Sequence, residues 1–450
     1  MKYLRGLCTL IFGVAVLLFF GLAYPHHLHY QEQYQLFLFD NTYVWDIVRL
    51  PGGVADLLGR FCTQFFLFAW VGALIIAVLL SLIQVLMLRL VKWGGLYGLT
   101  FLPSFLLWLF LLDENALMGG VWAVLLTLLV ISGCLLLPKG WMRRIAIVIA
   151  IPILYWMALG GSHYYRYPTV IPYLLYAAWL SAIILPLIVH FSKVQGLWLK
   201  VQGLTFLLVA VVMGTLVWKN ANFKAEKVMQ YDFMARYQQW NRILATANAE
   251  KPNNQIGVTV QNLALAMHGM LADHLFDYNQ NGIAGLLPDV QSDATSPLPT
   301  SEAFYQLGMI YVAQRTVFEA QEAILDFQKS ARCYQRLAQT NLINGSYEVA
   351  RKYLMALQKT LFYREWANET LLLLGNEEAI AKHPEYGRLR QCAYDKDFYF
   401  SDHVTPVMLE SLYSHNTDNR LAFEYLKAYY MLTGDRESYT KLLQELSVKK

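Results

Sequence analysis

Residues 63–88, TQFFLFAWVGALIIAVLLSLIQVLML, decide the fold of this chain. The stretch holds no charged residue, and it is longer than the roughly 20 apolar residues that a helix needs to cross the hydrocarbon core of a bilayer. Other apolar stretches follow one another through the first half of the sequence. We therefore predict about seven membrane-spanning helices, at residues 4–23, 63–88, 97–112, 118–137, 143–160, 169–191 and 200–218.

The composition changes sharply after the last of these stretches. Over the whole chain of 450 residues, 56% are hydrophobic and only 15% are charged, whereas about a quarter of the residues of an ordinary soluble protein are charged. Charged residues are sparse up to residue 218 and return at normal density from residue 219. We predict a transmembrane domain at 1–218 and a water-soluble domain at 219–450.

The positive charges predict the orientation of the helices. Loops that stay in the cytoplasm retain Lys and Arg. With the N-terminus inside, every inner segment carries positive charge: Lys2, Arg5, Arg89, Lys92, Lys139, Arg143, Arg144, Lys193 and Lys200. An odd number of spans then places the soluble domain outside the cytoplasm. We expect a protein of a bacterial inner membrane, in contact with membrane lipid, whose C-terminal domain is periplasmic.

The first outer loop, residues 24–62, is longer than a connection requires. Two of its segments suggest helices lying in the membrane interface, Tyr30–Phe39 and Val54–Phe65, with Pro51-Gly52-Gly53 as the turn between them. In the second segment the apolar residues recur at helical spacing on one face. Three nearby histidines, His26, His27 and His29, match no zinc signature, and we interpret them as interfacial side chains.

Polar residues of the three outer loops could converge on one pocket. Carboxylates there could deprotonate an acceptor hydroxyl or bind a divalent cation, and arginines could hold a lipid-linked phosphate. The catalytic candidates are Glu32 and Asp40, and the metal candidates are Asp113 and Glu114. The substrate-binding candidates are Arg49, Arg60, His163 and Arg166. The alternative is that all of these are ordinary solvated loop charges.

Other functional classes find little support in the sequence. The net charge of +4 is not gathered into a basic stripe and no nucleic-acid motif is present, so we expect no nucleic-acid partner. There is no phosphate-binding GxxxxGK[ST] loop, no GxSxG elbow and no HExxH motif. No CxxC pair occurs, and a disulfide between Cys333 and Cys392 stays open.

The soluble half shows helical periodicity almost throughout. One unit has Phe304, Leu307, Gly308, Tyr311 and Ala320 at the characteristic positions of a tetratricopeptide repeat. We expect Gly308 to let two helices approach, with Tyr311 and Ala320 packed across their contact. Further units around residues 334–354 and 423–435 extend the pattern. The prediction is an all-α protein: a polytopic bundle followed by a tetratricopeptide-like α-solenoid, which either offers a surface to a protein partner or covers the membrane half.

The predicted order is one span, a long outer loop with two interfacial helices, and six further spans. In this order the first 218 residues resemble the common module of the GT-C glycosyltransferases, integral membrane enzymes that use lipid-linked sugars. In that superfamily an acidic residue of the first outer loop serves as catalytic base or metal ligand, and a second acidic motif often lies in the next outer loop. The matching positions are Glu32 or Asp40, and Asp113 with Glu114. The first outer loop departs from the pattern because it holds no adjacent acidic pair and no DxD motif.

A second resemblance rests on HLHYQEQYQLFLF at 27–39 and PGGVADLLGRFCTQFF at 51–66. These runs are similar to a family of uncharacterised bacterial membrane proteins that carries only a domain-of-unknown-function label. Two functions stay open. One is a GT-C-like transferase that takes a sugar from a polyprenyl-phosphate donor at the outer face. The other is a non-catalytic scaffold whose solenoid binds an envelope partner.

Overall fold

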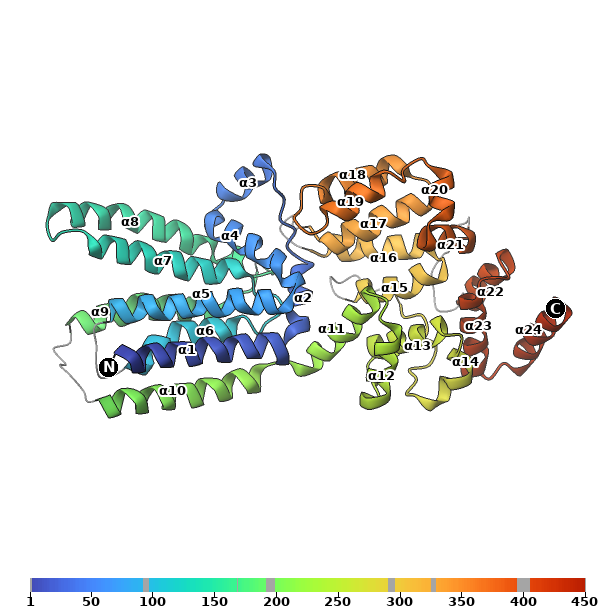
Figure 1. Ribbon diagram of the computed structural model, residues 1–450, viewed down its shortest axis with the longest axis horizontal. Coiled ribbons are helices and arrows are strands. Elements are labelled where there is room, and N and C mark those ends of the chain that lie inside the picture. The colour runs from blue at the N-terminus through green and yellow to red at the C-terminus, as the bar shows by residue number, and fades with distance from the viewer. Residues whose placement is uncertain are drawn as a thin grey trace. The chain divides into compact units, whose positions relative to one another are not determined.

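The structure is a computed structural model that describes residues 2–91, 97–167, 169–191, 199–289, 296–324, 329–394 and 405–449 (Figure 1). Within these ranges the regular secondary structure is helical throughout, which confirms the all-α prediction. Contacts between residues divide the chain after Glu226 into two compact units. Each unit is described by itself.

The first unit contains the apolar helices of the sequence. Its helices are α1 (Lys2–Leu18) with the π-helical turn η1 (Phe19–Ala23), α2 (Pro25–Glu32), α3 (Asn41–Val48), α4 (Gly53–Thr63), η2 (Gln64–Leu67), α5 (Ala69–Leu90), η3 (Tyr97–Phe101), α6 (Leu102–Phe110), α7 (Met118–Leu136), α8 (Trp141–Leu159), η4 (Gly160–Tyr164), α9 (Tyr173–Phe191) and α10 (Leu199–Asn220). Helix α11 (Phe223–Arg236) begins at the end of this unit.

Five helical stretches of the described residues are long and apolar enough to cross a membrane. They are Tyr3–Ala23, Ala69–Leu90, Met118–Leu136, Trp141–Tyr164 and Gly203–Asn220. Shorter apolar helices, Tyr97–Phe110 and Tyr173–Pro186, lie at the two remaining predicted positions. These helices are compatible with a membrane protein.

Two of the predicted spans begin differently in the structure. The predicted span 63–88 is interrupted at Phe68, whose backbone is extended (φ −112°, ψ 98°), so α5 starts at Ala69. The predicted span 97–112 starts with the 3-10 helix η3 and continues as α6, in whose first turn Pro103 lies. Proline is accepted in a first helical turn because the backbone N–H groups there have no partner within the helix.

Aromatic side chains and a few buried hydrogen bonds hold the first unit together. The ring of Phe12 on α1 meets those of Phe101, Phe105 and Trp108 edge to face, with centroid distances of 5.4, 5.1 and 6.0 Å. The hydroxyl of Thr9 donates to the amide oxygen of Gln84 at 2.8 Å, which joins α1 to α5. Edge-to-face pairs of this kind add about 0.5 to 1.5 kcal/mol each beyond their buried area.

Helices α4 and α7 pack with their backbones in close contact. A side-chain carbon built on Gly59 would lie 2.3 Å from the backbone nitrogen of Gly119. The turn before α4 is equally tight, because Gly52 has a positive φ of 70° and a side chain there would meet the hydroxyl of Tyr164. Only glycine permits both contacts.

One of the two helices predicted within residues 24–62 is confirmed and the other is not. The predicted helix Val54–Phe65 corresponds to α4, but the predicted helix Tyr30–Phe39 is wrong. Instead α2 begins at Pro25 and ends at Glu32, and extended backbone leads to Asp40, which caps α3. The abundance of aromatic residues in 30–39 misled the prediction, whereas Pro25 at the first helical position sets an earlier start.

The second unit is a succession of helices. They are α12 (Trp240–Glu250), α13 (Gln255–Met267), α14 (Leu271–His274), η5 (Leu275–Asp277), α15 (Pro297–Leu307), α16 (Ile310–Glu322), α17 (Ala331–Ile343), α18 (Tyr347–Leu357), α19 (Arg364–Leu371), α20 (Glu377–Lys382), α21 (Pro384–Cys392), α22 (Thr405–His415), α23 (Arg420–Thr433) and α24 (Arg436–Lys449). Within it α15 packs on α16, α16 on α17, and α17 on α18 (Figure 1).

Helix α15 ends at Gly308, a glycine that the sequence pattern singles out. Gly308 lies just past the helix with a φ of 93°, and a side chain there would approach the carbonyl oxygen of Cys392 to 2.7 Å. Ala320 is fully buried, as expected, whereas Tyr311 is 39% exposed and does not pack across the helix contact. Cys333 and Cys392 are both free thiols.

A buried ion-pair network joins three helices of the second unit. Arg332 on α17 donates to both carboxylate oxygens of Asp232 on α11, at 2.6 and 2.8 Å. It also lies 3.4 Å from a carboxylate oxygen of Glu302 on α15, which Arg336 contacts at 2.6 Å. All four side chains are nearly inaccessible. Such paired charges fix one arrangement of the helices, because leaving one member alone is costly.

Candidate functional site

Helix α2 is held by a carboxylate from a distant part of the chain. The backbone N–H of His26 donates to one oxygen of Glu226 at 2.7 Å, and that of His27 donates to the other at 2.8 Å. Tyr24, the residue before the helix, supplies no side-chain cap, so Glu226 takes that role. Burial raises the pKa of Glu226 to about 7, although both N–H donors act in the opposite direction.

His27 is fully buried beside this cap. Its Nε2 lies 2.9 Å from the carbonyl oxygen of Leu111 and its ring stacks on Tyr24, with 4.6 Å between the centroids. Because a carbonyl can only accept, Nε2 carries the proton. Burial lowers the pKa of His27 to about 4, so the imidazole is neutral near pH 7. His26 and His27 are thus packed inside the protein, which corrects their interpretation as interfacial side chains.

The three outer loops named by the sequence meet next to α2. The amide of Gln31 donates to the carbonyl oxygen of Ala116 at 2.9 Å, which joins the first loop to the second. The second joins the third, because the N–H of Arg166 donates to the carbonyl of Asn115 at 2.8 Å and the hydroxyl of Tyr165 donates to Asp113. We call this meeting point the loop junction.

Arg166 is the unusual residue of the loop junction. Its side chain is buried, with 4% of the residue exposed, and its guanidinium carbon lies 3.7 Å from the centroid of the Tyr34 ring. One guanidinium nitrogen donates to the hydroxyl of Tyr30 at 3.0 Å, and Tyr167 lies within 6 Å as well. Within the described part of the chain, no carboxylate pairs with it, and its Nε and second terminal nitrogen lack a hydrogen-bond partner.

Burial without a counter-ion makes this guanidinium an incomplete site. Desolvation disfavours the charge, but interactions with Tyr34 and Tyr30 outweigh it and leave the pKa of Arg166 above its ordinary value. Aromatic faces return only about 0.5 to 2 kcal/mol each, whereas a buried ion costs several kcal/mol in effective desolvation. An anion supplied from outside would complete both the charge balance and the two open donors.

The other predicted residues have the following places. Glu32 is buried at the end of α2, and His163 is half-buried in η4. Asp40 caps α3, where one carboxylate oxygen accepts from Thr42 and Tyr43. Asp113 and Glu114 are half-buried in the second loop. Arg49 is exposed and paired with Asp46 at 2.9 Å.

Arg60 is already neutralised. It pairs with Asp56 one turn earlier on α4, at 2.8 Å, and both side chains are buried. Burial alone would lower the pKa of Arg60, but Asp56 raises it well above its usual range. The loop junction therefore brings together Arg166 and Asp113 from the predicted set, with Glu32 on the adjoining helix α2, while Arg49 and Arg60 each have a carboxylate of their own.

A divalent cation finds no prepared site in the described residues. No group of three or more His, Cys, Asp or Glu side chains is arranged there to hold a metal ion. Asp113 is instead engaged by Tyr165 and by Asn115, whose backbone and side-chain N–H groups both donate to it. The metal role of Asp113 and Glu114 stays a prediction.

Sequence reasoning missed two features of this site. The role of Tyr30 and Tyr34 as the cation–π environment of Arg166 was not predicted, because more than 130 residues separate them from it in the sequence. The cap by Glu226 left no local signal, because 200 residues separate it from His26. The role of Asp40 did have a signal, since an aspartate before a helical run is a preferred N-cap.

One family model matches the chain over its whole length. A family model described as a family of unknown function, DUF6057, matches residues 1–163 and 158–450. The chain belongs to DUF6057. No curated protein and no solved structure matches it. The membership agrees with the resemblance to uncharacterised proteins drawn from residues 27–39 and 51–66, and it assigns no reaction to DUF6057.

Proposed function

We propose that this DUF6057 protein is an integral membrane protein that binds a phosphate-bearing lipid at Arg166 and acts as a GT-C-like transferase. The observation that carries the proposal is the buried guanidinium of Arg166, which has two open donors and no carboxylate partner among the described residues. A phosphate monoester or diester supplies negative charge and several acceptor oxygens, which is what this side chain lacks.

The membrane arrangement belongs to the same proposal. The seven spans consist of the five long apolar helices and the two shorter ones, with the N-terminus in the cytoplasm of a bacterial cell. The loop junction then lies at the outer face of the inner membrane, where polyprenyl-phosphate donors present their head groups. The second unit is the periplasmic, tetratricopeptide-like solenoid.

The proposed chemistry uses residues of α2 and the loop junction. Tyr30 and Tyr34 orient the guanidinium of Arg166 toward the donor phosphate. Glu32, two residues beyond Tyr30 in the chain, takes the proton of the acceptor hydroxyl. The acceptor oxygen then bonds to the anomeric carbon, and the polyprenyl phosphate leaves with the electron pair of the broken bond. No step requires a metal ion.

Lipid binding tests the proposal directly. The purified protein in detergent is offered a polyprenyl phosphate, with phosphatidylglycerol and inorganic phosphate as competing anions, and bound lipid is counted by native mass spectrometry. We expect Arg166→Gln to weaken polyprenyl-phosphate binding at least tenfold, because a charge-assisted bidentate contact is lost. Arg49→Gln is the matched control, since it removes an exposed arginine of the same outer region. Equal binding by Arg166→Gln and the wild-type protein would refute the proposal.

A second candidate function rests on the helix pairs of the second unit. The packing of α15 on α16 and α17 on α18, with Gly308 and Gly345 at positive φ after the first helix of each pair, supports a tetratricopeptide-like scaffold that binds an envelope protein. Complementation of a deletion strain separates the two functions. If Glu32→Gln, Asp40→Asn and Asp113→Asn all restore the wild-type phenotype at normal abundance, the scaffold is favoured.

A further inference from the structure

The outer loops of the sequence, at 24–62, 113–117 and 161–168, hold one arginine charge that no carboxylate neutralises. Arg49, Arg60 and Arg166 are their only arginines, and they contain no lysine. Arg49 pairs with an aspartate of α3 at 2.9 Å, and Arg60 pairs with one of α4 at 2.8 Å. His27 is neutral near pH 7, because burial lowers its pKa to about 4. Among the described residues of these loops, the unneutralised arginine is therefore Arg166.

The open donors of Arg166 form a fork. Its Nε and Nη2 lie on one edge of the guanidinium and have no hydrogen-bond partner in the described structure, whereas Nη1 donates to the hydroxyl of Tyr30 at 3.0 Å. An edge with two parallel N–H groups binds two oxygens of one phosphate. Gln35, next to Tyr34 in the chain, has an open amide nitrogen as well, but this group is uncharged. The site therefore combines several open donors with a single positive charge.

Tyrosine rings enclose this fork. The guanidinium carbon of Arg166 lies 3.7 Å from the centroid of the buried Tyr34 ring and 5.7 Å from that of Tyr167. Tyr167 is the outermost of these rings, with 36% of the residue exposed. An anion reaches the fork after a ring turns aside, and Tyr167 is the ring that lies at the surface. Once bound, the phosphate is largely shielded from water, which strengthens every interaction between charges.

Carboxyl groups belong to the same loop junction. The backbone N–H of Arg166 donates to the carbonyl of Asn115 at 2.8 Å, and Asn115 donates two hydrogen bonds to the carboxylate of Asp113. Glu114 lies between these two residues in the chain, and Glu32 is buried on α2. Negative charge is thus already present at the loop junction, and it repels a second negative charge on a bound phosphate.

The charge of a phosphate depends on how many of its oxygens are esterified. A diester has one negative charge, whereas a monoester gains a second one above its second pKa of about 6. Arg166 neutralises the first charge only. The second charge would be buried without a partner, which is strongly disfavoured. A pyrophosphate brings at least two charges and meets the same obstacle.

We propose that the fork of Arg166 selects a lipid phosphodiester, which has one negative charge, over a lipid phosphomonoester or pyrophosphate with two or more. This inference rests on the proposed lipid binding at Arg166 and names the phosphate that is bound. In the proposed transfer, the acceptor oxygen bonds to the anomeric carbon and Glu32 takes the acceptor proton. The bond from the anomeric carbon to the phosphate oxygen breaks, and its electron pair stays on that oxygen. The lipid monoester so formed has two charges, and repulsion expels it from the site that held the donor.

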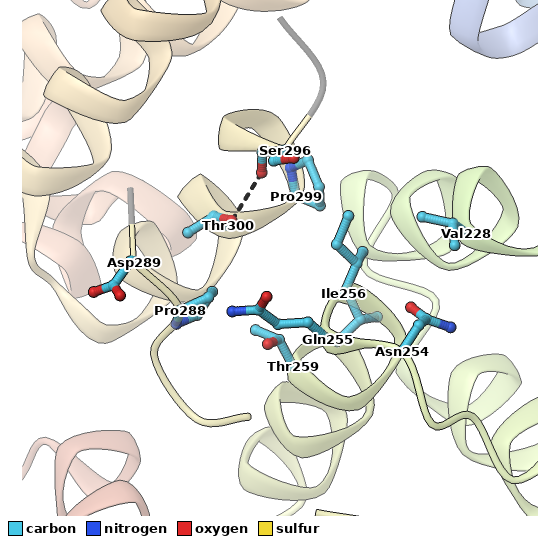
Figure 2. Close-up of a pocket in the computed structure, with 11 residues that line it drawn as sticks. Val228, Asn254, Gln255, Ile256, Thr259, Pro288, Asp289, Ser296, Pro299 and Thr300 are labelled. Carbon is cyan, nitrogen blue, oxygen red and sulfur yellow. Dashed lines mark hydrogen bonds between the residues drawn. The ribbon is translucent and has the colours of Figure 1, made fainter. Parts of the chain in front are cut away.

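The cavity of the second unit is unsuited to a phosphate. It has a volume of about 200 Å³ and lies among α11, α13, the start of α15 and the segment at Pro288 (Figure 2). No Lys, Arg or His belongs to its described lining, and Asp289 is the one charged residue there. A phosphate would meet repulsion instead of a counter-charge, so this cavity does not contribute to the binding measured below.

Two synthetic lipids with the same alkyl chain test the selection in the full-length protein. Methyl dodecyl phosphate is the diester and dodecyl phosphate is the monoester, and their affinities are measured by calorimetry in a neutral detergent at pH 5 and pH 8. We expect the ratio of monoester to diester affinity to fall about a hundredfold between these pH values, because only about 1% of the monoester has a single charge at pH 8. The diester corrects for the titration of the protein's own groups near the junction, which are His163, Glu32, Asp113, Glu114 and Glu226.

Substitutions separate the charge of Arg166 from its fork. Arg166→Gln removes both and should weaken the binding of both lipids at least tenfold. Arg166→Lys keeps the charge and loses the fork, so it should bind both lipids more weakly and keep the hundredfold change in the ratio. Tyr167→Lys adds a positive charge beside Arg166 and should raise the ratio at pH 8 about tenfold, since a charge at this distance commonly shifts a pKa by about one unit. Arg49→Gln, which removes an exposed arginine, is the control and should change nothing.

Two results would overturn this inference by itself. One is a wild-type ratio that does not fall between pH 5 and pH 8 while Arg166→Gln still weakens the binding of both lipids, which would show that dianions are accepted. The other is equal affinity for dimethyl phosphate and methyl dodecyl phosphate, which would assign the fork to a soluble diester. If neither lipid binds, or if Arg166→Gln binds both like the wild-type protein, lipid binding at Arg166 fails and the inference fails with it.

Discussion

Replacing Glu226 by glutamine should make the stability of α2 strongly dependent on pH. In the wild-type protein, burial shifts the pKa values of two groups at the start of this helix in opposite directions. Burial raises the pKa of Glu226 from 4.5 to about 7 and lowers that of His27 from 6.5 to about 4. The variant keeps the histidine and loses the carboxyl.

The sign of each contribution follows from proton linkage. The folded protein binds a proton at Glu226 more tightly than the unfolded chain, so this group stabilises below pH 4.5 and its contribution is lost as the pH rises through 7. His27 contributes above pH 6.5 and its contribution is lost as the pH falls through 4. Each amounts to about 3 kcal/mol at about 1.4 kcal/mol per pKa unit. As the pH falls from 7 to 4.5, the stability gained at Glu226 nearly cancels the stability lost at His27 in the wild-type protein.

Amide hydrogen exchange of the peptide containing residues 26–32 measures this local stability. After correction for the intrinsic exchange rate at each pH, wild-type protection should change little between pH 7 and 4.5. Protection in Glu226→Gln should fall about a hundredfold over the same interval, since about 3 kcal/mol is lost without compensation. His27→Gln, which can still donate to the carbonyl of Leu111, should behave in the opposite way.

If the protection of residues 26–32 changes with pH in the same way in the wild-type protein and in Glu226→Gln, this reasoning is refuted. That result would mean that the carboxyl has the same pKa in the folded and unfolded chain. Glu226→Ala provides an independent measure of the cap. It leaves the N–H groups of His26 and His27 without an acceptor, and we expect a loss of about 2 to 4 kcal/mol at pH 7. Lowered protection should then be visible at a single pH.

Two further predictions concern stability in the rest of the chain. Gly308→Ala should destabilise the protein more than Gly345→Ala, by at least about 1 kcal/mol in thermal unfolding, because both backbones have positive φ but only the first approaches a carbonyl of α21. Equal losses would show that the contact with α21 relaxes. Asp56→Asn should cost about 3 kcal/mol because it leaves the buried Arg60 unpaired, whereas Asp46→Asn, in an exposed pair, should cost less than about 1 kcal/mol.

The long helices were predictable because their signal lies within each segment. Residues 63–88 hold no charge and few polar side chains, and length alone distinguishes them from a strand. Gly308 was predictable for a similar reason, since a glycine after a helical run ends the helix with a positive φ. The boundaries were less accurate, and the interruption at Phe68 had no glycine or proline to announce it.

The loop junction was predictable only in part. The sequence placed Arg166 and Asp113 in neighbouring outer loops, and topology brought them to one place. The pair of Arg60 with Asp56 had a local signal, because the two residues are four apart on one predicted helix. The sequence could not show that Arg166 is buried without a carboxylate, because its surroundings depend on contacts between distant segments. The cap on α2 is the clearest example, since its carboxylate comes from Glu226 beyond the last apolar helix.

The backbone contact between Gly59 and Gly119 constrains how the protein can evolve. A side chain at Gly59 would enter the backbone of α7, so in a saturation mutagenesis screen this site should reject even alanine, and repair should require a shift of a whole helix rather than a second substitution. A side chain at Gly119 would first meet the ring of Tyr164, so there a smaller residue at position 164 should restore part of the space.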